Sequence, residues 1–347
     1  MKVLTLQAQG QLALEERPIP QPGKGEVLVK IGACGVCGSD VGRTMGGGAY
    51  HYPLVPGHEF AGAVVGLGPD VQAAYVGMRC VIFPMLPCGH CSNCQVGLYN
   101  LCKQYDYFGS RRDGGFEEYL VVPEWNLVPI PDSLPIWLAA LCEPLAVALH
   151  AINRCGVSLG ERVGIAGAGP IGLMAARAAM LGGASQVVLW DIDPTKLAFS
   201  RELGNEHTLD ATQDLSAYLQ QYGGGLDAVV EGTGSAQGLA ACIGVLKSRG
   251  RLVLLGNPGS DITLAKEAYW KLMRNEISLY GTWNSAYLKE LRNDWQTAVD
   301  LLNRDQEWFG RLISHRFTLE DGAAPLHMMA ERKEFFCKVL YSIDPTL

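Results

Sequence analysis

Positive charge is scarce in this chain, and this scarcity limits the class of partner. The 347 residues include 28 lysines and arginines against 35 aspartates and glutamates, a formal net charge of −7. Nucleic acids and anionic membranes attract basic surfaces, so we expect neither as the main partner. Charged residues make up only 18% of the chain and hydrophobic residues 48%, a composition typical of a globular protein with a large core.

Long hydrophobic runs, export signals and internal repeats are also lacking. No window approaches eighteen uninterrupted apolar residues, so we expect no membrane span. The first ten residues, MKVLTLQAQG, contain neither the apolar core nor the cleavage site of a signal peptide. We therefore expect a cytoplasmic protein, in a reducing compartment where clustered cysteines usually bind metal.

Four of the eleven cysteines lie in one short stretch, PCGHCSNCQVGLYNLC (87–102). Their spacing, C-x2-C-x2-C-x7-C, allows the thiolates to converge on one tetrahedral zinc ion, and the intervening glycines and asparagines favour the necessary turns. Four thiolates leave no open coordination position, so we expect a structural zinc and not a catalytic one. The predicted ligands are Cys88, Cys91, Cys94 and Cys102.

The pattern of apolar segments changes near residue 160, which predicts two domains. The earlier part has short apolar runs broken by glycine and proline, as in a mainly β domain. The later part alternates apolar strands with helices, as in a doubly wound parallel sheet, so the expected fold class is α/β. We place the mainly β domain at 1–152, completed by 286–347, and the second domain at 153–285. The expected strands are 27–34, 61–68, 78–85, 162–169, 186–193, 226–234 and 250–259, and the expected helices are 170–183 and 194–204.

A G-x-G-x-x-G pattern joins the first strand and helix of the second domain. Glycines there allow backbone N–H groups to approach a pyrophosphate, and Asp191 ends the next strand, where a carboxylate accepts from ribose hydroxyls. A carboxylate repels a 2′-phosphate, which favours NAD over NADP. Glycines that only pack a helix on a strand are the alternative. The candidate cofactor-binding residues are Gly167, Gly169, Pro170, Ile171, Gly172, Asp191 and Lys196.

A second group of metal-ligand types is spread through the first domain. Cys37, His58 and Glu59 provide a thiolate, an imidazole and a carboxylate, and Glu143 adds another carboxylate. Three protein ligands of these kinds suit a catalytic zinc that keeps one position open. Alone, His58 is more typical of a hydrogen-bonded structural histidine. The combination with a dinucleotide domain and a cysteine-rich loop favours the metal.

The motifs together resemble the zinc-dependent medium-chain dehydrogenases, along essentially the whole chain. Within that family the chain is most similar to enzymes of polyols and polyol phosphates, which carry a glutamate after the histidine and another before the proline of CEPL. The resemblance implies a Rossmann domain, a GroES-like catalytic domain, NAD and two zinc ions per subunit. The motifs that carry it are CGVCGSD (34–40), GHEFAG (57–62), the four-cysteine loop, CEPLAVALHA (142–151) and GAGPIG (167–172).

The resemblance also implies roles for single residues. Cys37 and His58 correspond to ligands of the catalytic zinc, and either Glu59 or Glu143 supplies the remaining carboxylate. Ser39 corresponds to the residue beside the reacting hydroxyl. Asp40 either orients His58 by accepting its other ring N–H or bonds to the local backbone of a turn.

One departure from the family concerns proton transfer. Many relatives have a histidine five residues after the cysteine ligand, where this chain has Gly42. We therefore expect Ser39, with water or a zinc-shell glutamate, to release the proton. The next residue, Arg43, replaces an aromatic and is a substrate candidate, as are Trp283 and Asn284. Two further arginines, Arg111 and Arg112, suit either a phosphate group or surface ion pairs.

The expected activity is NAD-dependent oxidation of a secondary hydroxyl of a small polyol or polyol phosphate, by a homodimer or homotetramer. Alternatives are a dehydrogenase of unphosphorylated polyols such as sorbitol or galactitol, and a threonine dehydrogenase. A further alternative, of another class, is a cofactor-binding structural or regulatory homologue without zinc chemistry.

Overall fold

The chain divides into two compact units in the computed structural model, which describes residues 1–289, 291 and 293–347. The first unit comprises Met1–Pro144 and Ala286–Leu347, and the second comprises Leu145–Ser285. The first boundary falls inside one continuous helix, α4 (Cys142–Cys155), whereas the sequence placed it at 152/153. An unbroken helix contains no turn residues that would indicate such a boundary.

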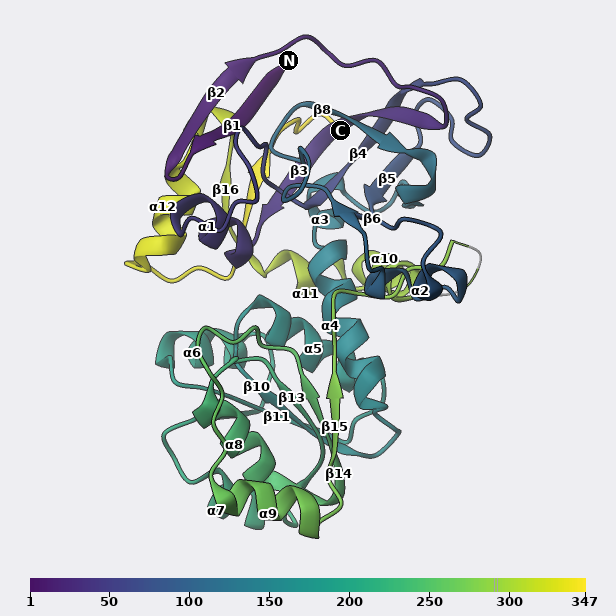
Figure 1. Ribbon diagram of the computed structural model, residues 1–347. Coiled ribbons are helices and arrows are strands. Elements are labelled where there is room, and N and C mark those ends of the chain that lie inside the picture. The colour runs from purple at the N-terminus through teal and green to yellow at the C-terminus, as the bar shows by residue number, and fades with distance from the viewer. Residues whose placement is uncertain (290, 292) are drawn as a thin grey trace. The chain divides into compact units, whose positions relative to one another are not determined.

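A seven-stranded sheet forms the centre of the first unit. Its order is β16-β17-β3-β4-β5-β9, and β8 pairs with β3. The C-terminal tail contributes β16 and β17, and α12 of this tail lies beside α1 (Figure 1). Apolar residues on the inner faces of these strands form one buried cluster. Two further pairs, β1–β2 and β6–β7, form separate two-stranded sheets. The strands of the first unit are β1 (Lys2–Ala8), β2 (Gln11–Glu16), β3 (Glu26–Val36), β4 (Glu59–Leu67), β5 (Arg79–Ile82), β6 (Met85–Leu86), β7 (Asp106–Tyr107), β8 (Tyr119–Pro123), β9 (Leu127–Pro129), β16 (Ile313–Phe317) and β17 (Lys338–Ser342).

Short helices connect the strands of the first unit. They are α1 (Gly38–Met45), α2 (Ser92–Gln95), α3 (Ile136–Ala139), α10 (Asp294–Arg304), α11 (Gln306–Gly310) and α12 (Ala324–Glu331), with 3₁₀ turns at Tyr99–Leu101, Glu124–Asn126 and Leu319–Asp321. One helical stretch, Ile136–Cys155, is long and apolar enough to cross a membrane, but 78% of its apolar window is buried inside the protein. Burial to this extent is typical of a core helix.

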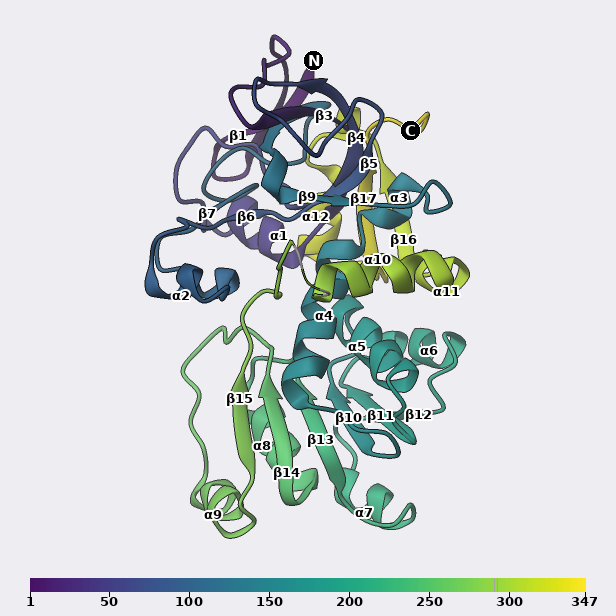
Figure 2. The ribbon, with the colours of Figure 1, turned by 90° about the vertical axis from the view of Figure 1, so that its right-hand side faces the viewer.

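The second unit contains a six-stranded parallel sheet. Figure 2 shows its order, β12-β11-β10-β13-β14-β15, which in chain order is 3-2-1-4-5-6. This is the doubly wound order of dinucleotide-binding domains, so the predicted α/β class is confirmed. Helix α5 packs against β10 and β11, and α8 packs against β13 and β14. The elements are β10 (Arg162–Ala166), α5 (Pro170–Leu181), β11 (Gln186–Asp191), α6 (Pro194–Glu202), β12 (His207–Asp210), α7 (Leu215–Gln220), β13 (Leu226–Glu231), α8 (Ala236–Val245), β14 (Leu246–Leu254), α9 (Lys266–Arg274) and β15 (Ser278–Gly281).

Candidate active site

The ends of two neighbouring strands, β3 and β4, position a group of ligand-type side chains, which we call the mixed site: Cys37, His58 and Glu59. Strand β3 ends just before Cys37, and β4 begins at Glu59, which pairs with Gly35 of β3. The cysteine sulfur, a ring nitrogen of the histidine and a carboxylate oxygen all lie within 4.8 Å of one another. Thiolate, imidazole and carboxylate are donors that zinc accepts, so this set fits a catalytic zinc with an open position.

Glycines on either side make room for the mixed site. A Cβ at Gly35 would lie 2.1 Å from Glu59 Oε2, so only glycine admits the glutamate side chain there. Gly57 has φ +90°, and a Cβ on it would lie 2.4 Å from the ring of Phe116. The backbone can therefore turn sharply before His58 only because position 57 is glycine.

A buried lysine that the sequence analysis did not identify joins the mixed site. Lys338 is the first residue of β17, and the pairing of Val339 with Val36 places it beside the end of β3. Its Nζ donates to Glu59 Oε1 at 2.5 Å, and both side chains are at most 5% exposed. Burial lowers the pKa of this ammonium, but the charges of Glu59 and Cys37 outweigh burial, so its pKa is raised. Lys338 therefore stays charged and offsets the negative charge of Glu59.

Asp40 lies beside both the histidine and the local backbone, but of these two it hydrogen-bonds only to the backbone. Oδ2 accepts from the backbone N–H of Cys37 at 3.0 Å, and Oδ1 lies 3.4 Å from His58 Nδ1 without the alignment of a hydrogen bond. Burial lowers the pKa of His58, but the charge of Asp40 outweighs it and raises that pKa well above its ordinary value. Burial raises the pKa of Asp40, but the His58 and Arg43 charges outweigh it and the pKa is lowered.

Arg43 also binds Asp40. Its Nη1 donates to Asp40 Oδ1 at 2.9 Å, and the arginine side chain is only 13% exposed. Its buried Nε has no partner among the described residues. The guanidinium thus binds the carboxylate that lies beside His58, whereas the sequence predicted that it would contact the substrate.

Glu143 lies outside the mixed site, in the first turn of helix α4. Its Oε1 accepts from the hydroxyl of Tyr107 at 3.3 Å, and the Tyr107 ring lies 5.9 Å from the ring of His58. Burial raises the pKa of Glu143 to about 7, partly opposed by the His58 charge. A carboxyl group with this pKa can hold or release a proton near neutral pH.

The residues after Cys37 on α1 differ in exposure. Ser39 is exposed on the first turn of the helix, whereas Asp40 is fully buried. Gly42 is exposed, and a Cβ there would meet nothing within 4 Å. A hydroxyl at Ser39 is thus in contact with solvent, as a proton-releasing group must be.

The second metal-type group is the four-cysteine lobe, Cys88–Cys102. All four sulfurs lie within 4.8 Å of one another, with pairs at 3.5, 3.9 and 4.0 Å. Four sulfurs around one zinc at about 2.3 Å would be separated by about 3.8 Å, so this set fits a closed zinc site. No disulfide links any of the chain's cysteines within the described residues.

Two thiols in the lobe have opposite pKa shifts. Backbone N–H groups of Lys103 and Cys94 lower the pKa of Cys91 to about 6. Burial raises the pKa of Cys94 to about 12. One ligand of the lobe is thus a thiolate at neutral pH before metal arrives, whereas another must lose its proton to bind.

The glycine pattern forms the turn between β10 and α5 in the second unit. Gly167 has φ +102°, and a Cβ at Gly172 would lie 1.9 Å from Gly167 O, so glycine is required at both positions. Gly169 precedes Pro170, the first residue of α5, and Ile171 follows in the first turn of that helix. The turn can therefore offer backbone N–H groups to a phosphate at the start of the helix.

Asp191 lies at the end of β11, next to this turn. Its carboxylate accepts from the backbone N–H groups of Ala168 at 2.7 Å and Asp193 at 2.9 Å. Lys196 Nζ lies 4.0 Å from Asp191 Oδ2. Another carboxylate, Glu231 at the end of β13, accepts from Thr233 and Gly234, and the sequence analysis did not identify it. Two strand ends of the sheet therefore carry carboxylates beside tight turns.

The remaining substrate candidates lie in the second unit, directly after β15. Trp283 is half exposed, and Asn284 has φ +57°. Their contact with substrate stays a prediction.

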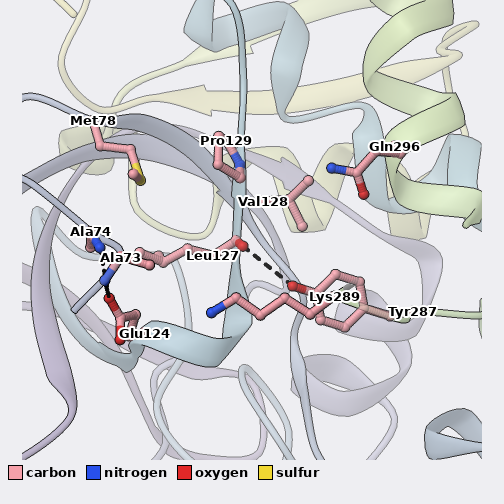
Figure 3. Close-up of a pocket in the computed structure, with 10 residues that line it drawn as sticks. All are labelled: Ala73, Ala74, Met78, Glu124, Leu127, Val128, Pro129, Tyr287, Lys289 and Gln296. Atoms are coloured by element: carbon pink, nitrogen blue, oxygen red, sulfur yellow. Dashed lines mark hydrogen bonds between the residues drawn. The ribbon is translucent and has the colours of Figure 1, made fainter. Parts of the chain in front are cut away.

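A surface pocket of about 300 Å³ lies elsewhere in the first unit (Figure 3). Two of its polar groups already bind the protein: Glu124 accepts from the backbone N–H groups of Ala73 and Ala74, and the Tyr287 hydroxyl donates to Leu127 O (Figure 3). No residue of either metal-type group lines it. The pocket is therefore separate from the candidate chemistry.

Two family descriptions match the chain. The alcohol dehydrogenase GroES-like domain covers residues 23–132, and the zinc-binding dehydrogenase family covers residues 170–304. Galactitol 1-phosphate 5-dehydrogenase of Escherichia coli K12 is 33% identical, over 95% of this chain and 96% of its own length. L-threonine 3-dehydrogenase of Mesorhizobium japonicum is 34% identical (92% and 93%), and D-altritol 5-dehydrogenase of Agrobacterium fabrum is 32% identical (92% and 94%).

Solved structures agree with these relatives. Galactitol-1-phosphate dehydrogenase from Escherichia coli superposes with a TM-score of 0.91, at 33% identity, over 99% of this chain and 100% of its own. An alcohol dehydrogenase from Escherichia coli CFT073, complexed with NADH, gives a TM-score of 0.89 at 28% identity and 99% coverage of both chains. The chain therefore belongs to the zinc-dependent medium-chain alcohol and polyol dehydrogenases, a family of oxidoreductases.

Proposed function

We propose that this enzyme oxidises a secondary hydroxyl of a polyol phosphate, of the galactitol 1-phosphate to tagatose 6-phosphate type, with NAD as the hydride acceptor. The observation that carries the proposal is the convergence of Cys37, His58 and Glu59 within 4.8 Å in a family of zinc-binding dehydrogenases. The phosphate is suggested by the 33% identity to galactitol 1-phosphate 5-dehydrogenase.

The mixed site would hold the catalytic metal. Cys37 and His58 are the constant ligands, and either Glu59 or Glu143 supplies the carboxylate. When bound, zinc supplies a Lewis acid that lowers the pKa of a substrate hydroxyl. Ser39 accepts the hydroxyl proton and passes it to water, because its side chain is exposed and position 42 carries no histidine. Cys88, Cys91, Cys94 and Cys102 would hold the structural zinc.

The turn after β10 would bind the dinucleotide. Backbone N–H groups near Gly167, Gly169 and Gly172 suit the pyrophosphate, with Pro170 and Ile171 opening the helix behind it. Asp191 suits the ribose hydroxyls and repels a 2′-phosphate, so NAD is the favoured cofactor. Lys196, 4.0 Å from that carboxylate, would help to hold it.

We also propose that the enzyme acts in the cytoplasm as a homodimer or homotetramer. Strand β15 is the last in the order of its sheet, and Leu279 on it is 41% exposed. An exposed strand at the end of a sheet offers backbone groups for pairing with another chain. Sedimentation of the purified protein gives the number of subunits directly.

Two other substrates have support among the relatives. L-threonine 3-dehydrogenase is 34% identical, and D-altritol 5-dehydrogenase, which is named for an unphosphorylated polyol, is 32% identical. An alcohol group on a small polar chain is common to all these compounds. The choice among them depends on residues beyond the mixed site.

The test is metal analysis followed by a reduction screen. We expect two zinc ions per chain, and NADH formation on galactitol 1-phosphate with a higher kcat/KM than on galactitol, sorbitol or L-threonine. NADP should support less activity than NAD. Equal or higher activity on L-threonine would replace the proposed substrate, and a zinc-loaded protein inactive on every alcohol would refute the proposed function.

A further inference from the structure

We propose that Arg111 binds the anionic end of the substrate and so selects phosphorylated polyols over neutral ones. The inference rests on the proposed function, because it names the residue that binds the phosphate group of the proposed substrate. It differs from the sequence analysis, which favoured Arg43 and left Arg111 open between a substrate and a surface role.

The guanidinium of Arg111 is held by two aromatic rings. Its Cζ lies 4.5 Å from the centroid of the Tyr105 ring and 4.8 Å from that of Tyr50. Tyr50 is 64% exposed, and Arg111 is exposed as well. Attraction between the cation and the ring faces fixes the planar group while the N–H edges remain able to donate.

A row of tyrosines connects this guanidinium with the mixed site. The rings of Tyr105 and Tyr107 lie 6.3 Å apart, edge to face, and the Tyr107 ring lies 5.9 Å from His58. The Tyr107 hydroxyl donates to Glu143. Arg111 is therefore at the outer end of a row whose inner end contacts the candidate zinc ligands. The proposal places the reacting hydroxyl of the substrate at the mixed site and its charged end, several carbons away, at Arg111.

Backbone hydrogen bonds attach the Arg111 segment to the segment that leads into His58. Gly114 N–H donates to Val55 O at 2.8 Å, and Gly115 N–H donates to Gly57 O at 2.7 Å. The His51 ring contacts Arg111 O at 3.0 Å. The position of Arg111 relative to His58 is thus fixed by the protein before substrate arrives, which lowers the entropic cost of binding.

The other two candidate arginines already have carboxylate partners. Arg43 binds the buried Asp40, and Arg112 Nη1 lies 3.8 Å from Asp106 Oδ2, with its guanidinium over the Phe108 ring. Among residues 1–289, 291 and 293–347, the Arg111 guanidinium forms no ion pair with a carboxylate. An arginine held by rings and left without a counter-ion is the one best suited to an incoming anion.

The ligand chemistry is a phosphate monoester or a carboxylate at the end of an open-chain polyol. Arginine donates two parallel hydrogen bonds to either group, with a stronger attraction to the doubly charged phosphate. Removing one such charge-assisted contact should weaken binding about ten- to a hundredfold. A neutral hexitol has no group that would use it.

The experiment compares Arg111→Ala with Arg112→Ala as the matched control, on the zinc-loaded enzyme with NAD. We expect Arg111→Ala to raise KM for galactitol 1-phosphate about ten- to a hundredfold with kcat nearly unchanged. Activity on galactitol should change less than about threefold in either variant. Arg111→Lys should recover only part of the affinity, because a lysine keeps the positive charge but lacks the planar guanidinium that donates two parallel hydrogen bonds. A hexonate, which carries a carboxylate in place of the phosphate, distinguishes the two anions. If Arg111→Ala raises KM for galactitol 1-phosphate but not for the hexonate, the site is specific for phosphate.

Equal losses on galactitol 1-phosphate and galactitol, or the same loss from Arg112→Ala, would overturn the assignment of Arg111. Calorimetry with the NADH-bound protein keeps this result separate from the proposed function, because binding does not require turnover. Wild-type protein that binds galactitol 1-phosphate more tightly than galactitol, with the difference lost in Arg111→Ala, supports the inference even if oxidation is not observed. Equal affinity of the wild type for both compounds would overturn it.

Discussion

The four-cysteine lobe and the mixed site differ in how far apart in the chain their members lie. All four ligands of the lobe come from residues 88–102, whereas the mixed site joins Cys37, His58 and Glu59 with Lys338, 279 residues after Glu59. The lobe therefore depends on local turns, and the mixed site depends on the register of a sheet. A local site can be complete without the rest of the fold, but the mixed site requires β3, β4 and β17 together.

Their charges differ as well. The lobe has four thiols, and no lysine or arginine among the described residues around it is buried, so a metal ion is its main source of positive charge. Next to the mixed site, Lys338 pairs with Glu59 and Arg43 pairs with Asp40, so two cations offset part of the local negative charge without metal. We therefore expect loss of a ligand to affect stability in the lobe and activity in the mixed site.

Cys37→Ser should give the largest effect on activity. Without this ligand the site should no longer hold the catalytic zinc, which acts as the electrophile. We expect the loss to remove about 4 kcal/mol or more of transition-state stabilisation, which lowers kcat/KM about a thousandfold. The variant should still fold and quench tryptophan fluorescence when NADH is added, and metal analysis should find one zinc instead of two. Cys80→Ala, a buried thiol of β5, is the control. Activity within tenfold of wild type would contradict the role of Cys37.

Cys91→Ser should instead reduce stability. A closed site with three thiolates holds zinc weakly, and losing a structural metal is among the few single changes that cost about 4 kcal/mol or more of unfolding free energy. Thermal and denaturant unfolding would show the loss, while kcat per folded molecule stays near that of wild type at low temperature. An unchanged melting temperature would mean that the lobe does not support the fold.

The sequence was informative where the determining interactions are local. The strand–turn–helix around Gly167, the spacing of the four cysteines and the apolar runs of β3 and β4 all depend on neighbouring residues, and the structure contains them. The start of β14 at Leu246, ahead of the expected 250, shows the limit of such patterns. Segment ends are set by pairing with β13, which the sequence does not display.

Lys338 could not be placed from the sequence because its position depends on strand register. The letters FFCKVLYS show a lysine inside an apolar strand, which is a signal for a buried ion pair, but not for its partner. Only the pairing of β17 with β3, and of β3 with β4, identifies Glu59. The ion pair of Arg43 with Asp40 shows the same limit at shorter range, since an (i, i+3) spacing on a helix permits contact without requiring it.

Lys338→Met tests whether the mixed site needs its internal cation. Removing one partner leaves the buried Glu59 charge unpaired, which we expect to cost about 3 kcal/mol of stability in the metal-free protein. Activity should fall about ten- to a hundredfold, because groups that hold metal ligands affect metal affinity. Lys30→Met, which breaks the more exposed pair with Asp344, is the control and should cost about 1 kcal/mol or less.

The double variant Glu59→Gln with Lys338→Met sharpens this test. Removing both charges eliminates the unpaired carboxylate, so the stability of the metal-free protein should recover most of the loss. Activity should not recover, since Glu59 is also a candidate ligand. Additive loss of stability in the double variant would show that the two side chains do not act as a pair.

The smallest expected effect concerns the pH dependence of zinc binding by the lobe. The Cys91 pKa is lowered to about 6, so this group is a thiolate above pH 6, and below pH 6 a proton competes with zinc for its sulfur. Cys94, with a pKa raised to about 12, loses a proton on binding throughout this range and contributes a constant slope. Zinc affinity should therefore fall about tenfold more per pH unit below pH 6 than above it.

Chelator competition on the Cys37→Ser protein, in which only the lobe binds zinc, measures the zinc affinity of the lobe from pH 5 to 7. Adding Cys91→Ser should remove the break in slope, and a straight line through pH 6 in the single variant would contradict the assigned pKa of Cys91.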